Sequence, residues 1–390
     1  MLELPVYLDH NSTTPCDHRV VEAMLPFFTR DFGNAASHSH AFGWKAKEAV
    51  DYAREQVANL IGASSGEIIF TSGATEADNL AIKGVFEMYA GKGNHIITSG
   101  IEHKAVLDTC RHLEKLGAEI TYLPVSPEGF VDLNKLESAI KPTTILIAIM
   151  YANNEIGTIM PVREIGFIAR KHGVLFFTDA TQAVGKIPVH VDNDNIDLLA
   201  MTAHKLYGPK GTGALYVRRK GPRVRLTAQM DGGGHEKGLR SGTLNVPGIV
   251  GLGKACQICQ LEMSREAERL SKLRDQLEQA LLGLGQVFVN GSKQNRLPQV
   301  TNLCFKDVDS NGLMMALQKN IAVSSGSACT SATPEPSYVL KALGLSDELA
   351  HSSLRFSLGR KTMEEEIDYT IEQVSKTVHK LRGELTWSIT

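Results

Sequence analysis

The chain has 390 residues, of which 43% are hydrophobic, and its formal net charge at neutral pH is −2. This length exceeds what one hydrophobic core usually serves, so two domains are expected. A net charge so close to zero gives no electrostatic reason to expect a nucleic acid or a membrane surface as a partner. Direct nucleic-acid binding is therefore not expected.

The start of the chain and its cysteine content both indicate an intracellular protein. MLELPVYLDHNSTTP has no basic segment followed by an apolar one, and no run approaches the roughly 18 apolar residues of a membrane span. The six cysteines are too few and too scattered for a disulfide framework, which fits a reducing compartment. A soluble, cytoplasmic protein is expected.

The first part of the chain is predicted to be mostly helical. A helical period runs from Arg19 to Phe28, a polar loop follows, and residues 41–61 form a long amphipathic helix. The loop contains His38 and His40, but no acid or thiol is spaced to complete a metal site with them. No metal site is predicted.

A strand, a glycine turn and a helix are predicted over IIFTSGATEADNLAIKG. The first residues of a helix offer free backbone N–H groups and the positive end of the helix dipole. Gly73, Ala74 and Thr75 stand at that start, so they are predicted to cradle a phosphate group.

Strands continue to alternate with helices from residue 66 to about 217. HIITSGIEHKAVL places His103 after a strand, and YANNEIGTIMP follows the apolar run Ile145–Met150. This alternation predicts an α/β fold with a mainly parallel, doubly wound sheet.

Two further apolar runs, at 174–178 and 196–203, are predicted to be buried strands that end beside one crevice. The polar residues at their ends are Asp179, Gln182, Thr202, His204 and Lys205. A carboxylate and a lysine amine together suit pyridoxal 5'-phosphate: the amine can form a Schiff base with its aldehyde, and the carboxylate keeps its ring nitrogen protonated. Lys210 is the nearest competing lysine, but its Gly-Pro-Lys-Gly turn is expected to point it elsewhere.

The second half of the chain contains a basic segment, a glycine-rich loop and a long helix. RRKGPRVR is predicted to be a solvated hairpin tip, with contact to an acidic partner or to tRNA as the alternative. MDGGGHEKGLRSGTLN is predicted to be a loop, and residues 246–284 a helical connection. Cys256 and Cys259 have CxxC spacing inside that helix without a second pair, so packing is favoured over zinc or redox chemistry.

The last third is predicted to hold a small α+β unit, which begins near Val287 and leads into AVSSGSACTSATPEPSYVL. Cys329 lies there among Ser, Gly, Ala and Thr residues, a composition typical of an exposed loop rather than of an inert buried thiol.

Several of these segments, in the same order, resemble the motifs of the pyridoxal-phosphate-dependent cysteine desulfurases of the IscS/NifS type, within the class V aminotransferase superfamily. They are TSGATEADNLAIKG, TDATQAVGK, AHKLYGPKGTG, RSGTLN and SSGSACTSATPEPSYVLKALG. The similarity runs from LDHNSTTP to RFSLGRKTMEEEIDYT, nearly the whole chain. One departure is His38, near which the family usually has an arginine.

The resemblance implies the PLP-dependent transferase fold type I, with a large cofactor-binding domain at 16–259. A small α+β domain would comprise 1–15 and 260–390 and carry the catalytic Cys loop, about 324–334. By the same resemblance the catalytic residues are Lys205, His103 and Cys329. The implied cofactor contacts are Ala74, Thr75, His103, Asn154, Asp179, Gln182, Thr202, His204, Lys205 and, from the neighbouring subunit of a homodimer, Thr243. Asn154 and Arg355 would bind the substrate, and Arg355 would pair with its carboxylate.

The implied activity is that of a cysteine desulfurase, which converts L-cysteine to L-alanine and transfers sulfur to Cys329 as a persulfide. The acceptor stays open among an iron–sulfur scaffold, tRNA thiolation, nitrogenase maturation and DNA phosphorothioation. The alternatives are another superfamily activity, such as a transaminase or a selenocysteine lyase, or a binding protein that uses the cofactor fold as a sulfur-relay scaffold. Only sulfur transfer accounts for Cys329 in its loop.

Overall fold

The computed structural model describes residues 2–325 and 335–387, without the side chains of 384–387. Its largest element is a seven-stranded sheet in the order β2-β8-β7-β6-β5-β3-β4. These strands are Ile68–Thr71 (β2), His95–Ser99 (β3), Glu119–Leu123 (β4), Thr144–Ala148 (β5), Leu175–Asp179 (β6), Leu198–Thr202 (β7) and Gly213–Val217 (β8). Strands β3 to β7 pair in parallel, whereas β8 runs antiparallel to both β7 and β2. The prediction of a mainly parallel α/β sheet is confirmed.

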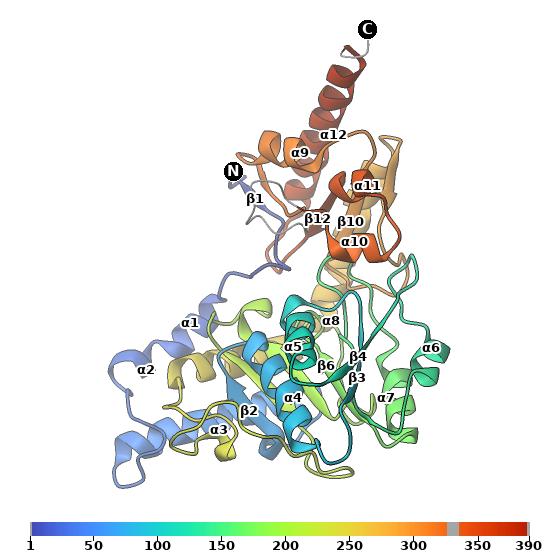
Figure 1. Ribbon diagram of the computed structural model, residues 1–390. Helices are drawn as coiled ribbons and strands as arrows, with labels where there is room; N and C mark the ends of the chain where they lie inside the picture. The colour runs from blue at the N-terminus through green and yellow to red at the C-terminus, as the bar shows by residue number, and fades with distance from the viewer. Residues whose placement is uncertain (1, 326–334, 388–390) are drawn as a thin grey trace.

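Helices cover both faces of this sheet (Figure 1). Side chains alternate between the two faces of a strand, so Ile96 and Ile97 of β3 enter different core clusters. Ile97 packs in the cluster of α3 (Ala41–Ile61), α7 (Val162–Lys171) and α8 (Val246–Leu282). Ile96 packs in that of α4 (Ala74–Met88) and α5 (Lys104–Glu114). Burial on both faces explains why these strands are near-continuous apolar runs.

The helix predicted over residues 19–28 is broken in two. The structure has α1 at His18–Met24 and α2 at Pro26–Thr29. Pro26 lacks a backbone N–H, so it cannot continue α1 but suits the first position of α2. The long helix α3 has the predicted bounds, and His40 caps its start by accepting a hydrogen bond from the Gly43 N–H.

The second part of the fold is a smaller α+β unit, drawn above the large sheet in Figure 1. Its three-stranded sheet has the order β12-β10-β9, and the short β1 pairs in parallel with β11. The strands are Val6–Tyr7 (β1), Val287–Val289 (β9), Val300–Phe305 (β10), Ile321–Ala322 (β11) and Ser353–Ser357 (β12). The helices are Ser310–Leu317 (α9), Tyr338–Ala342 (α10), Asp347–His351 (α11) and Glu364–Trp387 (α12), while α6 (Leu133–Ser138) belongs to the larger part.

One helix and one extended segment connect the two parts. Cys256, in the first half of α8, packs in the core of the larger part, and Leu277 of the same helix packs in the core of the smaller unit. After β1, the chain from Asp9 to Thr14 passes between the parts. Asp9 pairs with Ser357 of β12, and the Thr14 N–H bonds the carbonyl of His204, 2.9 Å away.

The basic segment after β8 does not form the predicted hairpin tip. The strand ends at Val217, and residues 218–228 form no strand. Four of the segment's five basic residues are exposed as predicted, namely Arg219, Lys220, Arg223 and Arg225. Arg218, in contrast, is buried and donates to Asp192 and to the carbonyls of Val191 and Ile196. Within the described ranges, none of the helices is long and apolar enough to cross a membrane.

Candidate active site

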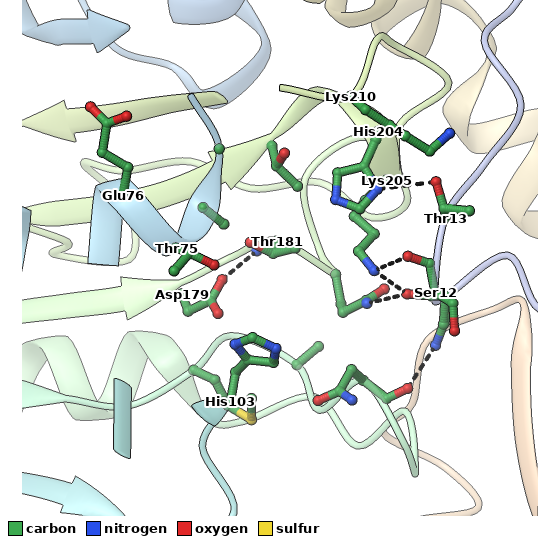
Figure 2. A pocket seen from close by; sticks show the side chains of 18 of the residues that line it. Ser12, Thr13, Thr75, Glu76, His103, Asp179, Thr181, His204, Lys205 and Lys210 are labelled. Atoms are coloured by element: carbon green, nitrogen blue, oxygen red, sulfur yellow. Dashed lines mark hydrogen bonds between the residues drawn. The ribbon is translucent and has the colours of Figure 1, made fainter. Parts of the chain in front are cut away.

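A cavity of about 710 Å³ lies at the carboxyl ends of the parallel strands (Figure 2). The predicted site residues that line it are Ala74, Thr75, His103, Asn154, Asp179, Gln182, Thr202, His204, Lys205 and Arg355. Thr243 is exposed and does not line this cavity in the described part of the chain. Cys329 lies outside the described residues. Segments far apart in sequence thus meet where an open α/β sheet binds its ligand.

The start of helix α4 forms one end of the cavity. Gly73 is its N-cap, and Ala74 and Thr75 are its first residues. A Cβ atom at Gly213 of β8 would lie 2.7 Å from the Gly73 Cα, so glycine at 213 lets this turn pack directly against the sheet. The first N–H groups of a helix lack intrahelical acceptors and attract anions.

Asp179 and His103 lie next to each other on one side of the cavity (Figure 2). Asp179 ends β6, and its Oδ1 accepts a hydrogen bond of 2.9 Å from the Thr181 N–H. His103 is the N-cap of α5, where its Nδ1 accepts from the Ala105 N–H at 3.2 Å. Because Nδ1 is the acceptor, a neutral His103 carries its proton on Nε2.

Lys205 extends across the cavity from the short 3-10 helix that follows β7, Ala203–Lys205. Its Nζ donates to the backbone carbonyls of Asn11 and Ser12. Burial, together with the nearby Arg355 guanidinium, lowers the pKa of Lys205 to about 8, against the opposing effect of Asp9 and Asp179. An amine with this pKa is partly neutral near pH 8, as a nucleophile or a base must be.

Gln182 is held in one orientation by its neighbours. Its Oε1 accepts a hydrogen bond of 2.8 Å from Lys186, and its Nε2 donates to the Asn11 carbonyl at 2.9 Å. The Asn11 Oδ1 in turn accepts from Gln299 at 3.0 Å. The side chain of Gln182 is therefore oriented by residues from both parts of the fold.

His204 and Thr202 form the wall next to Lys205. His204 Nδ1 lies 3.1 Å from the Thr13 hydroxyl, and the Thr202 hydroxyl donates to the Thr212 carbonyl at 3.1 Å. Burial lowers the pKa of His204 to about 4, with Lys205 and other lysines contributing, so its ring is neutral at pH 7.

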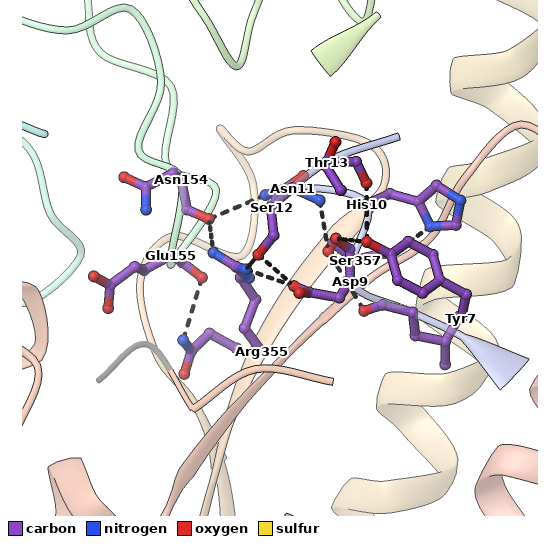
Figure 3. A network of polar contacts seen from close by, with 12 residues as sticks. Tyr7, Asp9, His10, Asn11, Ser12, Thr13, Asn154, Glu155, Arg355 and Ser357 are labelled. Carbon is purple, nitrogen blue, oxygen red and sulfur yellow. Dashed lines mark hydrogen bonds and ion pairs between the residues drawn. The ribbon is translucent and has the colours of Figure 1, made fainter. Parts of the chain in front are cut away.

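Arg355 approaches the cavity from β12 of the smaller unit (Figure 3). Its Nη2 donates to Asp9 and to the Ser12 hydroxyl, each at 2.7 Å, and its Nη1 donates to the Asn154 carbonyl at 3.0 Å. The side chain is only 4% exposed, and its Nε has no partner among the described residues. Since Ser12 also contacts Lys205, the guanidinium and the amine lie near each other.

The sequence analysis missed several residues at this site. Asn11, Ser12 and Thr13 line the cavity through the segment between the two parts, and the sequence analysis included them only as part of the segment LDHNSTTP. Lys186 was visible only as part of TDATQAVGK. Lys210 was expected to point elsewhere, yet it also lines the cavity, and Figure 2 shows it on the far side of His204 from Asp179.

The comparisons with known proteins agree with this geometry. Residues 6–370 match the family model described as aminotransferase class-V, and the chain belongs to that family. It is 58% identical to a protein named cysteine desulfurase IscS from Anaeromyxobacter sp. (strain Fw109-5), over 98% of this chain and 94% of that protein. A solved NifS-like protein matches with a TM-score of 0.90 and 38% identity, covering 96% of this chain and 100% of that one. A structure of SspA in complex with cysteine matches with a TM-score of 0.80 and 38% identity, over 90% and 98% of the two chains.

Pyridoxal 5'-phosphate is the cofactor of this family and of this chain. The cavity offers what such a group needs: a helix start for its phosphate, a carboxylate for its ring nitrogen and a lysine with a lowered pKa. Some buried polar atoms beside the cavity have no partner in the described ranges, and two of these are Asn154 Oδ1 and Thr181 Oγ1. Buried polar atoms are normally hydrogen-bonded, so partners from a bound ligand fit here.

Proposed function

We propose that this chain is a cysteine desulfurase that converts L-cysteine to L-alanine and passes the sulfur on through an enzyme persulfide. The observation that carries the proposal is the meeting of Lys205 and Arg355 at Ser12, with Asp179 lining the same cavity. An α-amino acid has a carboxylate next to its reactive Cα. An arginine can bind the carboxylate, and a neutral lysine beside it can remove the Cα proton.

Arg355 binds the carboxylate of cysteine. Its Nε has no partner among the described residues, and a bidentate contact would form when the carboxylate also accepts an Nη2 proton that Asp9 or the Ser12 hydroxyl accepts in this structure. The Asn154 carbonyl holds the guanidinium in position through Nη1. The Asn154 side chain, whose Oδ1 is unpartnered among the described residues, lies beside the same substrate.

When bound, pyridoxal 5'-phosphate supplies an electron sink that weakens the bonds to Cα of the amino acid. Asp179 would hold the proton of the ring nitrogen, and the start of α4 together with Thr243 of the partner subunit would bind the phosphate. Lys205 takes the Cα proton on its Nζ and later returns a proton to the product. His103, with its proton on Nε2, exchanges a proton at the cavity mouth.

Sulfur transfer requires a thiolate. The Cys329 thiolate attacks the substrate Sγ, the Cβ–Sγ bond breaks, and its electron pair stays with the carbon fragment, which takes up protons and leaves as L-alanine. The sulfur that is transferred is oxidised and the carbon is reduced, so no external redox agent is needed. The enzyme keeps a Cys329 persulfide for an acceptor.

Two observations support Cys329 as the nucleophile. Burial raises the pKa of each of the other five thiols, those of Cys16, Cys110, Cys256, Cys259 and Cys304. A buried thiol is a poor nucleophile. In addition, Ser324 pairs with Arg355 through backbone hydrogen bonds, and four residues from Ser325 to Cys329 can span roughly 14 Å. This chain length permits residue 329 to reach a substrate bound at Arg355.

The homodimer is supported by an exposed aromatic surface on the N-terminal helices and the loops beside them. Its large side chains are Phe28, Phe32, Phe42, Trp44 and Tyr52, each more than half exposed. Exposed apolar groups gathered in this way typically mark an interface. Thr243 is exposed and does not line the cavity of its own chain in the described residues, so it is accessible to a partner subunit.

The two-domain division at 16–259 and at 1–15 with 260–390 remains part of this proposal. It is supported by the separate core that joins Val6 and Leu8 to residues of the C-terminal part. Its boundary at 259/260 falls inside the continuous helix α8.

A cytoplasmic location is supported by free thiols at all five cysteines of the described ranges. An iron–sulfur scaffold or a tRNA thiolation relay is the proposed acceptor, because the relatives are named cysteine desulfurase IscS.

The function is tested by incubating the purified protein with L-cysteine and measuring L-alanine, while protein persulfide is trapped by alkylation and located by peptide sequencing. Equal amounts of alanine and of persulfide on Cys329 are expected in one turnover. Cys329→Ser should still bind cysteine and change colour with it, but should form neither product, because a serine hydroxyl is not a sulfur acceptor.

Cys304→Ser is the matched control and should behave as the wild type, since its thiol is buried. Normal alanine release by Cys329→Ser would point to a lyase that needs no thiol. A keto acid as the product would point to a transaminase.

A further inference from the structure

Asp78 is a buried carboxyl group without a partner. It lies on the inner face of α4, one turn after the predicted phosphate-binding residues, and is 1% exposed. Neither of its carboxyl oxygens has a hydrogen-bond donor among the described residues. A buried polar group is normally satisfied, so this side chain needs an explanation.

The surroundings of Asp78 are acidic. One atom each of Asp78, Asp179 and His103 lie within 4.8 Å of one another. Glu102, which precedes His103, is also buried and interacts electrostatically with Asp78. These groups come from the elements that surround Asp78, namely α4, β6 and the turn before α5. The charges that act on Asp78 are those of Asp179 and Glu102, and both make its ionisation less favourable.

The burial of Asp78 and Glu102 favours the neutral form of both carboxyls. Burial raises the pKa of Asp78 well above its usual range, and repulsion from Asp179 and Glu102 adds to the effect. Burial also raises the pKa of Glu102, to about 8, despite its hydrogen bonds from Ser99 and the Met150 N–H. Like charges this close in a buried site cannot both ionise at low cost. Of the two aspartates, Asp179 is the one that accepts a hydrogen bond, from the Thr181 N–H, whereas Asp78 has no donor among the described residues.

We propose that Asp78 is a positioning residue: a permanently neutral carboxylic acid whose O–H points at the Asp179 carboxylate and keeps Asp179 as the ionised partner of the cofactor's ring nitrogen. The inference rests on the assignment of Asp179 to that nitrogen. Asp179 then has two fixed donors, the Thr181 N–H and the Asp78 O–H, and keeps an oxygen lone pair for the ring. Buried carboxylic acids that stay neutral to donate a hydrogen bond are known at active sites.

Infrared spectroscopy of the full-length holoprotein tests the protonation state directly. A protonated carboxyl has a carbonyl stretch that a carboxylate lacks. At pH 7 the spectrum of Asp78→Asn should lack one such band that the wild-type spectrum contains. Glu102→Gln provides the matched control for a second buried acid. Loss of carboxylate bands in Asp78→Asn would overturn the proposal.

The hydrogen bond itself is tested with two variants of similar size. Asp78→Asn keeps a neutral donor and should bind pyridoxal 5'-phosphate as the wild type does, while Asp78→Leu has no donor and should bind it roughly 10- to 100-fold more weakly. Exchange of the cysteine Cα proton with solvent deuterium should slow in Asp78→Leu and stay normal in Asp78→Asn.

Wild-type affinity and exchange in Asp78→Leu would contradict the positioning role, and equal damage in both variants would show that a charge is needed at residue 78. If Asp78→Leu does not fold, the infrared result and the cofactor affinity of Asp78→Asn still decide. A protein that transfers no sulfur would refute the proposed function but would leave these binding and infrared results interpretable.

Discussion

The lowered pKa of Lys205 leads to a prediction about how the cofactor attaches. The neutral amine is the form that attacks the cofactor's aldehyde, and the protonated form is inert. A pKa of about 8 leaves about one tenth of the Lys205 amines neutral at pH 7, whereas an ordinary lysine near 10.4 has well below 0.1% neutral. The burial of Lys205 and the nearby Arg355 should therefore make attachment at pH 7 roughly 200-fold faster than for an ordinary lysine.

The measurement is the rate at which the cofactor's visible band grows after pyridoxal 5'-phosphate is mixed with protein stripped of cofactor. The rate should rise with pH and level off above a midpoint near 8, because the amine loses its proton there. Lys205→Met should give no covalent band. Lys210→Met is the matched control, since it removes the other lysine that lines the cavity, and it should leave the band intact.

Two neighbouring residues should move this midpoint in opposite directions. Asp9→Asn removes a carboxylate that raises the pKa of Lys205, so the midpoint should fall below 8. Arg355→Gln removes the cation that lowers it, so the midpoint should rise. A wild-type midpoint near 10, or a shift of both variants in the same direction, would refute the argument that burial and Arg355 control this amine.

Two further variants test the substrate and phosphate contacts. Arg355→Lys should raise the KM for cysteine roughly 10- to 150-fold, because a point charge cannot form the bidentate contact, while the spectrum of the bound cofactor stays unchanged; an unchanged KM would contradict the role. Thr243→Ala should weaken cofactor binding by a similar factor. Mixed dimers of Thr243→Ala with Lys205→Met subunits should regain cofactor affinity at the intact Lys205, because the partner supplies Thr243; no recovery would place Thr243 in its own subunit's site.

The elements were predictable where a local pattern sets them. Helix α3 has the bounds that its period and the following Gly62 indicate, with Gly62 in the left-handed conformation at φ 68°. The strands that end at Asp179 and Thr202 were predicted within two residues, because burial on both faces requires apolar side chains at every position. The break at Pro26 was missed, although proline is a local signal, because the apolar period continues through it.

The errors concern residues whose environment is distant in sequence. Arg218 belongs to a basic run that suggests a solvated turn, yet its guanidinium is buried against Asp192 and the carbonyls of Val191 and Ile196. The sequence shows the charge but not the carbonyls that surround it.

The sequence by itself determined the alternation of strands and helices, and with it which polar residues stand at strand ends and face one crevice. That follows from short-range periodicity and from the geometry of parallel sheets. Only the tertiary structure decided what those residues become. The pKa of Lys205 depends on burial and on Arg355, which lies 150 residues later in the chain, and its amine is bound by the carbonyls of Asn11 and Ser12, more than 190 residues earlier. Asp78 is an ordinary helical aspartate in sequence, and its pKa is raised because folding removes it from water and places it beside Asp179 and Glu102.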